Sequence, residues 1–256
     1  MERFENKVVL ITGGATGIGL AAARCFAQEG AKVVIASRNE AAGQQAVADI
    51  QASGGKAIFI QTDVTQEAQV EALIKQTTET HGRIDAAFNN SGTEGIPSPL
   101  ADDNQKNYQK VFEVNVKGLW LCMKHQLKHM QQQGDGAIVN NASIAGLIGF
   151  PGLGLYTASK HAVLGLTKAA ALENAALGIR VNAVSPGMIE TDMAERFLSA
   201  QPGNKEDTIA SVKSMHPIGR FGKPEEIASA VTWLCSDEAS FVAGQSLTVD
   251  GGFTAI

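Results

Sequence analysis

A glycine-rich turn near the start of the chain constrains the fold more than any other feature of the sequence. It follows residues 7–12, a short apolar run of the kind that forms a buried parallel strand. Gly13, Gly17 and Gly19 space the turn as GxxxGxG, and an alanine-rich stretch at 20–29 then predicts a helix. Such glycines let the backbone approach a pyrophosphate, and the helix start offers free N–H groups and a positive dipole end. The turn therefore predicts a dinucleotide site, although its spacing differs from the more common GxGxxG.

The rest of the chain alternates predicted strands with predicted helices. Further strands are predicted at 32–36, 57–60, 86–88, 137–139, 179–184 and 246–249, and further helices at 39–52, 66–80, 108–132, 156–176 and 224–235. This alternation predicts an α/β fold with one Rossmann-like, doubly wound parallel sheet of about seven strands and helices on both faces. No linker or repeat divides the chain, so we expect a single domain over residues 1–256. Ligands of such a sheet bind beyond the carboxyl ends of its strands. Several chemistry-bearing positions follow predicted strand ends: Gly13, Asp63, Asn89, Ser143 and Pro186.

A tyrosine and a lysine four residues apart suggest proton-transfer chemistry. Tyr156 and Lys160 would lie on one face of a helix, and Ser143 lies thirteen residues before the tyrosine. A free tyrosine has a pKa of about 10, and a cation held beside it favours the phenolate. A phenol adjusted in this way can exchange a proton with a carbonyl or an alcohol, while a serine hydroxyl holds the same oxygen. A core tyrosine beside a solvated lysine would have the same spacing, but the glycine-rich turn favours the catalytic interpretation.

These motifs together resemble the short-chain dehydrogenase/reductase family over essentially the whole chain. The resemblance rests on Thr12-Gly13-x-x-x-Gly17-Ile18-Gly19, Asp63-Val64, Asn89-Asn90-Ser91-Gly92, Asn115-Val116-x-Gly118, Ser143, Tyr156-x-x-x-Lys160, Pro186-Gly187 and Thr191. Ser91 replaces the alanine that the family has at this place, a small change that we expect to be tolerated.

The resemblance implies a catalytic set and a cofactor site. The implied catalytic residues are Asn115, Ser143, Tyr156 and Lys160, with Tyr156 as general acid and base. Lys160 would also bind the nicotinamide ribose, and Asn115 would hold a water that links Lys160 to solvent. The expected cofactor-binding residues are Gly13, Thr16, Gly17, Ile18, Gly19, Ser37, Arg38, Asp63, Val64, Asn90, Ser91, Gly92, Tyr156, Lys160, Pro186, Gly187, Ile189 and Thr191.

The end of the second predicted strand bears on the choice between NADP(H) and NAD(H). An acidic residue there would bind a ribose diol and repel a 2′-phosphate. This chain has Ser37 and Arg38 instead, and an arginine can make a paired, charge-assisted contact to phosphate. NADP(H) is therefore favoured. NAD(H) stays possible, because Ala15 and Thr16 add no second cation and Glu40 lies nearby.

The segment 188–217 is expected to cover the substrate. Long loops of this kind often act as lids, and this one carries Met188, Ile189, Met193, Phe197 and Leu198. An opposite wall is expected from Ile96, Pro97, Ile148, Phe150, Leu153 and Leu155. A pocket built this way would be apolar with one polar end, which suits a small hydrophobic ketone or secondary alcohol.

Three other functions share some or all of these features. A 3-oxoacyl-[acyl-carrier-protein] reductase has the same motifs but tends to carry a basic residue at the place of Leu177, although Lys124 and Lys128 could form a basic patch. An NAD-dependent alcohol or sugar dehydrogenase is a second alternative. A nicotinamide-sensing binding protein would be expected to lack Tyr156 or Lys160, so it carries the least weight.

Composition narrows the partners. The net charge of −5 gives no indication of nucleic-acid binding, and no apolar run is long enough to span a membrane. The first residues show no secretory core, and Cys25, Cys122 and Cys235 suggest free thiols of a reducing cytoplasm. No metal site is expected, because His and Cys residues are not clustered. The apolar helices at 108–132 and 156–176, together with the family resemblance, predict a homotetramer, with a dimer as the fallback.

Overall fold

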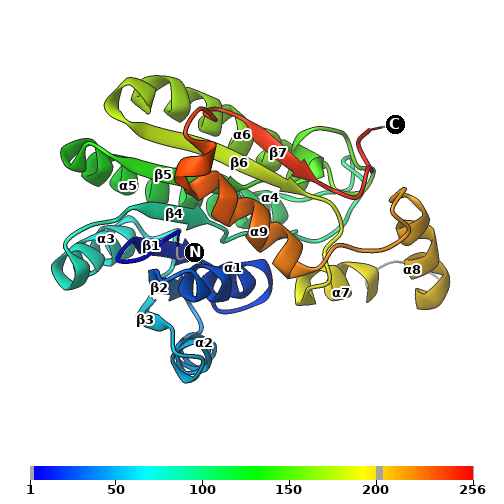
Figure 1. Ribbon diagram of the computed structural model, residues 1–256. Coiled ribbons are helices and arrows are strands. Elements are labelled where there is room, and N and C mark those ends of the chain that lie inside the picture. The colour runs from blue at the N-terminus through cyan, green and yellow to red at the C-terminus, as the bar shows by residue number, and fades with distance from the viewer. Residues whose placement is uncertain (1–2, 200–203, 256) are drawn as a thin grey trace.

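The carboxyl ends of seven parallel strands meet at one edge of the molecule, which is where the sequence predicts the site (Figure 1). The computed structural model describes residues 3–199 and 204–255. The sheet has the order β3-β2-β1-β4-β5-β6-β7, and every pair of neighbours is parallel. The strands are β1 (Val8–Thr12), β2 (Lys32–Ser37), β3 (Lys56–Gln61), β4 (Ala86–Asn89), β5 (Gly136–Asn141), β6 (Ile179–Pro186) and β7 (Ser246–Val249). The predicted Rossmann-like fold is confirmed.

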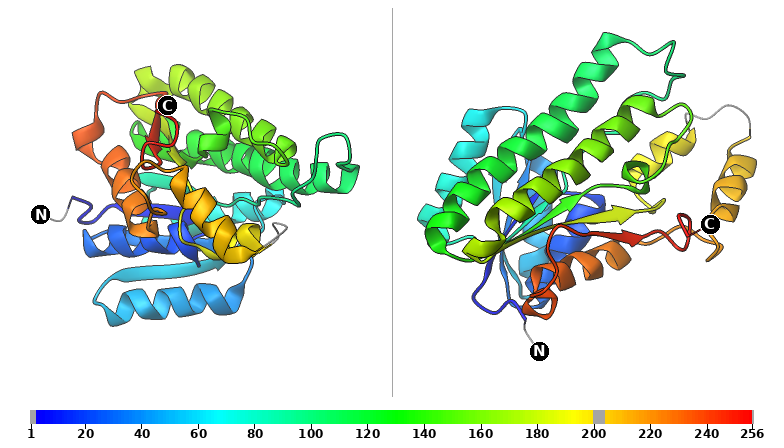
Figure 2. Two further views of the ribbon diagram at one scale, coloured as in Figure 1. Left: turned by 90° about the vertical axis from the view of Figure 1, so that its right-hand side faces the viewer. Right: turned by 90° about the horizontal axis from the view of Figure 1, so that it is seen from above.

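Helices cover both faces of this sheet (Figure 2), and the two larger hydrophobic cores among the described residues lie one on each face. Because successive strand residues point to opposite faces, Val9 and Ile11 belong to one core and Val8 and Leu10 to the other. The first core contains side chains of α1 (Gly17–Gln28), α2 (Glu40–Ala52) and α9 (Pro224–Cys235). The second contains side chains of α3 (Glu67–His81), α5 (Leu119–Gln133) and α6 (Gly154–Asn174). None of the helices within 3–199 and 204–255 is both long and apolar enough to cross a bilayer.

The helix predicted at 108–132 is longer and less regular than expected. It begins with α4 (Gln105–Phe112), because the side chain of Asn104 accepts a hydrogen bond from the Asn107 N–H at its start. A π-helical turn, Glu113–Gly118, then joins α4 to α5. Such turns are rare and occur often at functional sites, and this one contains Asn115.

The predicted lid segment has secondary structure of its own. It carries α7 (Asp192–Ser199) and α8 (Lys205–Ser214), where the sequence pattern suggested only a loop. Both helices lie beyond the carboxyl ends of β6 and β7, at the edge where ligands of such sheets bind (Figures 1 and 2). Residues 200–203 of the predicted lid lie outside the described residues.

Candidate active site

Two connected hollows open at the carboxyl edge of the sheet. The first, the glycine-loop cleft, has a volume of about 770 Å³ and runs past the turn after β1 and the ends of β2 and β3. The second, the apolar pocket, has a volume of about 260 Å³ and lies between Tyr156 and the segment that carries α7 and α8. They share the residues Ile18, Asn90, Gly92, Asn141, Thr191 and Met193. Because the hollows share these residues, one bound molecule could extend from the first hollow into the second.

Close backbone contacts shape the glycine-rich turn. Gly13 has φ of +63°, a conformation that favours glycine, and its N–H donates to the Ala36 carbonyl at 2.7 Å. A Cβ at Gly19 would overlap the Gly13 carbonyl oxygen and come within 2.6 Å of Asn90 Nδ2. Helix α1 starts at Gly17 with no capping side chain from Thr16. Its first N–H groups are therefore available to an anion in the cleft.

The turn after β4 is tied to the end of β1. The hydroxyl of Thr12 accepts hydrogen bonds from the N–H groups of Asn90 (3.1 Å) and Ser91 (3.2 Å). The Asn90 side chain donates to the Gly13 carbonyl at 3.0 Å and accepts from Asn141 Nδ2 at 2.9 Å. These hydrogen bonds between uncharged groups fix the position of the turn after β4 relative to the glycine-rich turn.

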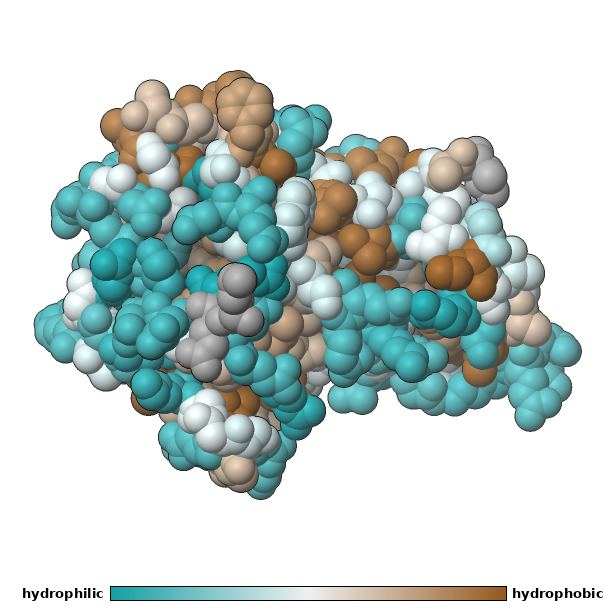
Figure 3. All heavy atoms as spheres, viewed as in Figure 1, coloured by the Kyte–Doolittle hydropathy of each residue, from teal (hydrophilic) through white to brown (hydrophobic). Residues whose placement is uncertain are grey.

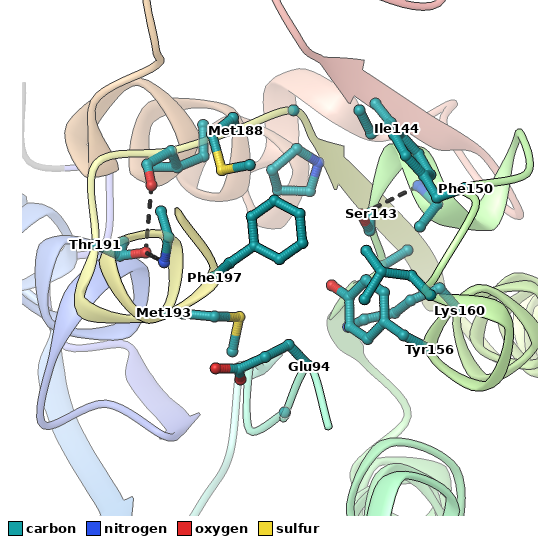
Figure 4. A pocket seen from close by; sticks show the side chains of 18 of the residues that line it. Glu94, Ser143, Ile144, Phe150, Tyr156, Lys160, Met188, Thr191, Met193 and Phe197 are labelled. Carbon is teal, nitrogen blue, oxygen red and sulfur yellow. Dashed lines mark hydrogen bonds between the residues drawn. The ribbon is translucent and has the colours of Figure 1, made fainter. Parts of the chain in front are cut away.

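Ser143, Tyr156 and Lys160 come together at the base of the apolar pocket (Figure 4). Tyr156 lies in the first turn of α6, and its side chain and that of Ser143 line the same end of the pocket (Figure 4). Lys160, one turn later, is buried, and its Nζ donates to the Asn141 carbonyl at 2.7 Å. That Nζ lies 5.5 Å from the centroid of the Tyr156 ring. The spacing of four residues therefore places both side chains at one site, as the sequence predicts.

Burial dominates the protonation of this pair. It raises the pKa of Tyr156 to about 12, against a lowering by the nearby Ser143 hydroxyl, and the negative charge of Glu94 raises it further. Burial also lowers the pKa of Lys160 to about 8. The sequence argument considers the lysine charge alone and expects a lowered Tyr156 pKa, whereas burial reverses the net direction and raises it.

Asn115 is bonded to the turn that follows β4. Its Oδ1 accepts from the Thr93 N–H at 2.8 Å, and its Nδ2 donates to the Thr93 carbonyl at 2.9 Å and to Ser159 Oγ at 3.0 Å. A Cβ at Gly92 would lie 3.5 Å from Asn115 Oδ1 and 3.7 Å from Lys160 Nζ. Asn115 is thus near Lys160 but lines neither hollow, and its role in holding a water stays a prediction.

The far end of the glycine-loop cleft contains the residues that bear on cofactor choice. Arg38 is exposed and lines the cleft, and none of the ion pairs among the described residues involves it. Ser37 Oγ donates to the Asn39 carbonyl at 3.3 Å, and Asp63 Oδ1 accepts from the N–H and hydroxyl of Thr65. The guanidinium of Arg38 is therefore the cation at this end that is available to a bound anion.

Most of the predicted site residues line one of the two hollows. The glycine-loop cleft is lined by Gly13, Thr16, Gly17, Ile18, Ser37, Arg38, Asp63, Val64, Asn90, Ser91, Gly92 and Thr191. Ser143, Tyr156, Lys160, Pro186, Gly187 and Ile189 line the apolar pocket. Gly19 lies buried beneath the turn instead, where it permits the close approach to Gly13.

The expected walls of the apolar pocket need partial correction. Met188, Ile189, Met193, Phe197, Phe150 and Leu153 line it as predicted, whereas Leu198, Ile96, Pro97, Ile148 and Leu155 do not. The Leu198 side chain is buried outside the pocket, and the Ile96 side chain is exposed to solvent. Residues that sequence reasoning missed include Thr93, Glu94, Ile144, Val212, Met215, His216 and Phe253. Thr93 and Glu94 had a local signal, because they are the two residues after the Asn-Asn-Ser-Gly motif, and Ile144 directly follows Ser143.

His216 joins the lid to the wall of the apolar pocket. It is buried, its Nδ1 lies 2.9 Å from the Val212 carbonyl, and its Nε2 lies 3.2 Å from the Met188 N–H. These partners assign a neutral ring with the proton on Nδ1. The ring also packs against Phe253, with centroids 5.0 Å apart.

The space-filling view shows apolar side chains gathered beside the end of β7 and toward α8 (Figure 3).

Sequence comparison identifies relatives over the full length of the chain. The family model described as "Enoyl-(Acyl carrier protein) reductase" matches residues 13–254. The chain is 44% identical to 2,5-dichloro-2,5-cyclohexadiene-1,4-diol dehydrogenase of Sphingobium indicum, with 100% of both chains covered. It is 41% identical to cyclohexanol dehydrogenase of an Acinetobacter species, covering 99% of this chain and 97% of the relative.

Solved structures give the same result. The crystal structure of levodione reductase superimposes with a TM-score of 0.96 at 38% identity, covering 98% of this chain and 99% of that one. A short-chain type dehydrogenase/reductase from Mycobacterium marinum gives a TM-score of 0.92 at 36% identity, covering 99% and 97% of the two chains.

Proposed function

Because this chain belongs to the short-chain dehydrogenase/reductase family, we propose that Tyr156 exchanges a proton with a ring alcohol or ring ketone while a hydride passes to or from NADP(H). The coarser activity follows from family and relatives: the chain is an oxidoreductase that acts on secondary alcohols or ketones. One observation carries the finer proposal. The side chains of Tyr156 and Ser143 lie together at the polar end of a pocket whose other walls are largely apolar (Figure 4).

The size and lining of the apolar pocket support a compact ring substrate. A volume of about 260 Å³ accommodates a small molecule, and its side chains include Ile144, Phe150, Met188 and Phe253. The relatives named above act on a cyclohexadienediol and on cyclohexanol. Apolar walls favour the ring carbons, and the Ser143 and Tyr156 hydroxyls orient the oxygen at the reacting carbon.

The protonation state of Tyr156 defines its part in each direction. With its pKa raised to about 12, the phenol is protonated at neutral pH and can donate to a ketone oxygen. In the oxidation direction the phenolate must take the proton of the alcohol, and the Lys160 cation one helical turn away favours that form. A nicotinamide cofactor held in the glycine-loop cleft would supply or accept the hydride.

The glycine-loop cleft has the residues to hold such a cofactor. The uncapped start of α1 suits the pyrophosphate, and the cradle between Gly13 and Gly19 leaves no room for a side chain. Arg38 at the far end suits a 2′-phosphate, which favours NADP(H) over NAD(H). Asp63 and Val64 also line this cleft, and we assign them to the adenine end of the cofactor.

Substitution of Tyr156 tests the proposed chemistry. Tyr156→Phe keeps the ring and removes the proton donor, so kcat should fall by about two to four orders of magnitude. Oxidation of cyclohexanol and reduction of cyclohexanone, followed by absorbance of the reduced cofactor with NADP(H) and with NAD(H), measure this.

Cofactor titration provides the control for that variant. Tyr156→Phe should bind NADPH within a few-fold of the wild type, measured by fluorescence titration, because the glycine-loop cleft is untouched. Turnover close to the wild-type rate in Tyr156→Phe would contradict the mechanism. Activity on 3-oxoacyl thioesters or sugars in place of ring substrates would favour one of the alternative reductases.

We also propose a homotetramer and a cytoplasmic location. Trp120 on α5 and Leu172 on α6 are large apolar side chains that are 46% and 86% exposed, as expected for helices that meet a second copy. Apolar atoms gather on the upper edge of the molecule, over α6 and the turn before β7 (Figure 3). The three free cysteines are consistent with a reducing compartment. Light scattering at micromolar concentration should give four chain masses, and the mass of a single chain would refute the assembly.

A further inference from the structure

We propose that Glu94 selects ring substrates that carry a second hydroxyl group, by accepting a hydrogen bond from that hydroxyl inside the apolar pocket. Glu94 lies beside Met193 at the edge of this pocket, with Tyr156 on the other side of its side chain (Figure 4). The inference rests on the proposed function and extends it from the reacting oxygen to a second polar group. It assigns a specificity-determining residue outside the Ser143, Tyr156 and Lys160 set.

The carboxylate of Glu94 lies at the pocket and has lone pairs that its protein partner does not use. Its side chain is only 15% exposed. It accepts hydrogen bonds from Arg196 of α7, with Nε 3.0 Å from Oε1 and Nη2 3.4 Å from Oε2. A carboxylate offers about four lone-pair sites, so two donors from one arginine leave positions for a substrate hydroxyl.

The loop that carries Glu94 is fixed on both sides by asparagine side chains. Asn115 exchanges two hydrogen bonds with the backbone of Thr93, directly before the glutamate. Asn107 exchanges two with the backbone of Ile96, at 2.9 Å each. Between them Gly95 has φ of +74°, and a Cβ there would lie 2.8 Å from Asn107 Oδ1. A hydrogen-bond acceptor on so constrained a loop is pre-organised, which reduces the entropy lost on binding.

The charge of Glu94 is unfavourable for the proton transfer itself. It raises the pKa of Tyr156 and so opposes the phenolate that alcohol oxidation requires. An anion next to apolar walls also loses solvation, which Arg196 offsets only in part, because that arginine is 60% exposed. A role in substrate recognition accounts for an acceptor in this position, since a neutral apolar residue would serve proton transfer better.

A simpler role for Glu94 is to fasten α7 to the body of the molecule through Arg196. Arg196→Met separates the two roles, because it removes the ion pair and keeps the carboxylate. A fastening role predicts that Glu94→Leu and Arg196→Met change the kinetics of every substrate in the same way. A recognition role predicts that only changes at Glu94 alter the preference between substrates.

The experiment compares kcat/KM for cyclohexane-1,3-diol and cyclohexane-1,4-diol with kcat/KM for cyclohexanol, in the same preparations of full-length protein. The ratio for the better diol should fall by about ten- to hundredfold in Glu94→Leu, the loss expected for a hydrogen bond to a charged group. Glu94→Gln keeps the shape and one acceptor oxygen, so its ratio should lie between wild type and Glu94→Leu. Arg196→Met should keep the wild-type ratio within about threefold.

Two results would overturn the inference while leaving the proposed function standing. One is a diol ratio that is the same in wild type, Glu94→Gln and Glu94→Leu. The other is an equal fall in the ratio in Arg196→Met and Glu94→Leu, which would make Glu94 a fastening residue only. Failure of the wild type to oxidise any of these alcohols with either cofactor would instead count against the proposed function.

Discussion

The glycine-loop cleft and the apolar pocket share a wall, yet they are built from different kinds of contact. The cleft is formed by backbone groups at the ends of β1, β2 and β4, joined by direct hydrogen bonds such as that from the Gly13 N–H to the Ala36 carbonyl. The pocket is closed by side chains of α7, α8 and the C-terminal segment. The rings of His216 and Phe253 pack against each other there, with their centroids 5.0 Å apart. The sheet therefore positions the glycine-loop cleft, whereas the apolar pocket depends on side chains that pack against the end of the sheet.

This difference implies different tolerance to change. At Gly13 and Gly19 in the cleft, a new side chain would meet main-chain atoms of Ser91 or Gly13 as well as Asn90 Nδ2, and the main-chain atoms cannot move independently of the sheet. In the pocket, they are ends of flexible side chains such as Met188 and Met193, which can adjust or be exchanged. A fixed cofactor site with a variable substrate site is the arrangement by which one fold serves many substrates.

The largest effect on the cleft should come from adding one methyl group at Gly19. In Gly19→Ala the new Cβ would overlap the Gly13 carbonyl oxygen, so the turn has to open. Overpacking costs roughly 1–3 kcal/mol, and contact with main-chain atoms belongs at the upper end, near a hundredfold in cofactor affinity. Fluorescence titration with NADPH and NADH measures it, and both affinities should fall together.

Gly149→Ala is the matched control for that variant. A Cβ at Gly149 meets no atom within 4 Å, and this glycine also follows a strand end of the site, after Ser143. Its cofactor affinity should stay within a few-fold of wild type. Equal affinities in Gly19→Ala and wild type would show that the turn is more pliable than its contacts imply.

A smaller and more selective effect is expected at Arg38. Arg38→Leu should weaken NADPH binding by roughly ten- to hundredfold through loss of a charge-assisted phosphate contact, and leave NADH nearly unchanged. Ser37→Asp should move the preference further toward NADH, because a carboxylate repels the phosphate and binds ribose hydroxyls. Titration of both cofactors into wild type and both variants measures this.

The competing role for Arg38 is stacking on adenine by its planar face. That role would help both cofactors alike, so Arg38→Leu would lower both affinities by the same factor. Such a result, or a wild type that already prefers NADH, would replace NADP(H) by NAD(H) in the proposal.

Sequence reasoning located the cleft well because its determinants are local. A strand, a glycine turn and a helix follow one another along the chain, and the topology of parallel strands then gathers their ends at one edge. Predicted strand boundaries were short by one or two residues at Ser37, Asn89 and Pro186, at the carboxyl ends of β2, β4 and β6. Even so, Ser37 and Pro186 line the hollows as their motifs predict, and their roles stay predictions.

The pocket was predicted less well because its determinants are distant in sequence. Helices α7 and α8 fill a segment in which no pattern indicated them, and Lys205 of α8 pairs with Glu195 of α7. Phe253 reaches the pocket from the other end of the chain, which no spacing rule can show. The pKa of Tyr156 was missed for the same reason, since burial depends on everything packed around the group.

The smallest effect, and the sharpest contrast between the halves, should come from two methionines of the lid. Met188 lines the apolar pocket but not the glycine-loop cleft, whereas Met193 lines both hollows (Figure 4). Met188→Ala keeps the backbone bond to His216 and adds space for ring carbons. The kcat/KM ratio of cycloheptanol to cyclopentanol should rise by up to about tenfold, the scale set by one or two methylenes in an apolar pocket. NADPH affinity should be unchanged in Met188→Ala and reduced a few-fold in Met193→Ala. If Met188→Ala weakened the cofactor as much as Met193→Ala does, the two hollows would behave as one site and the distinction drawn between them would fail.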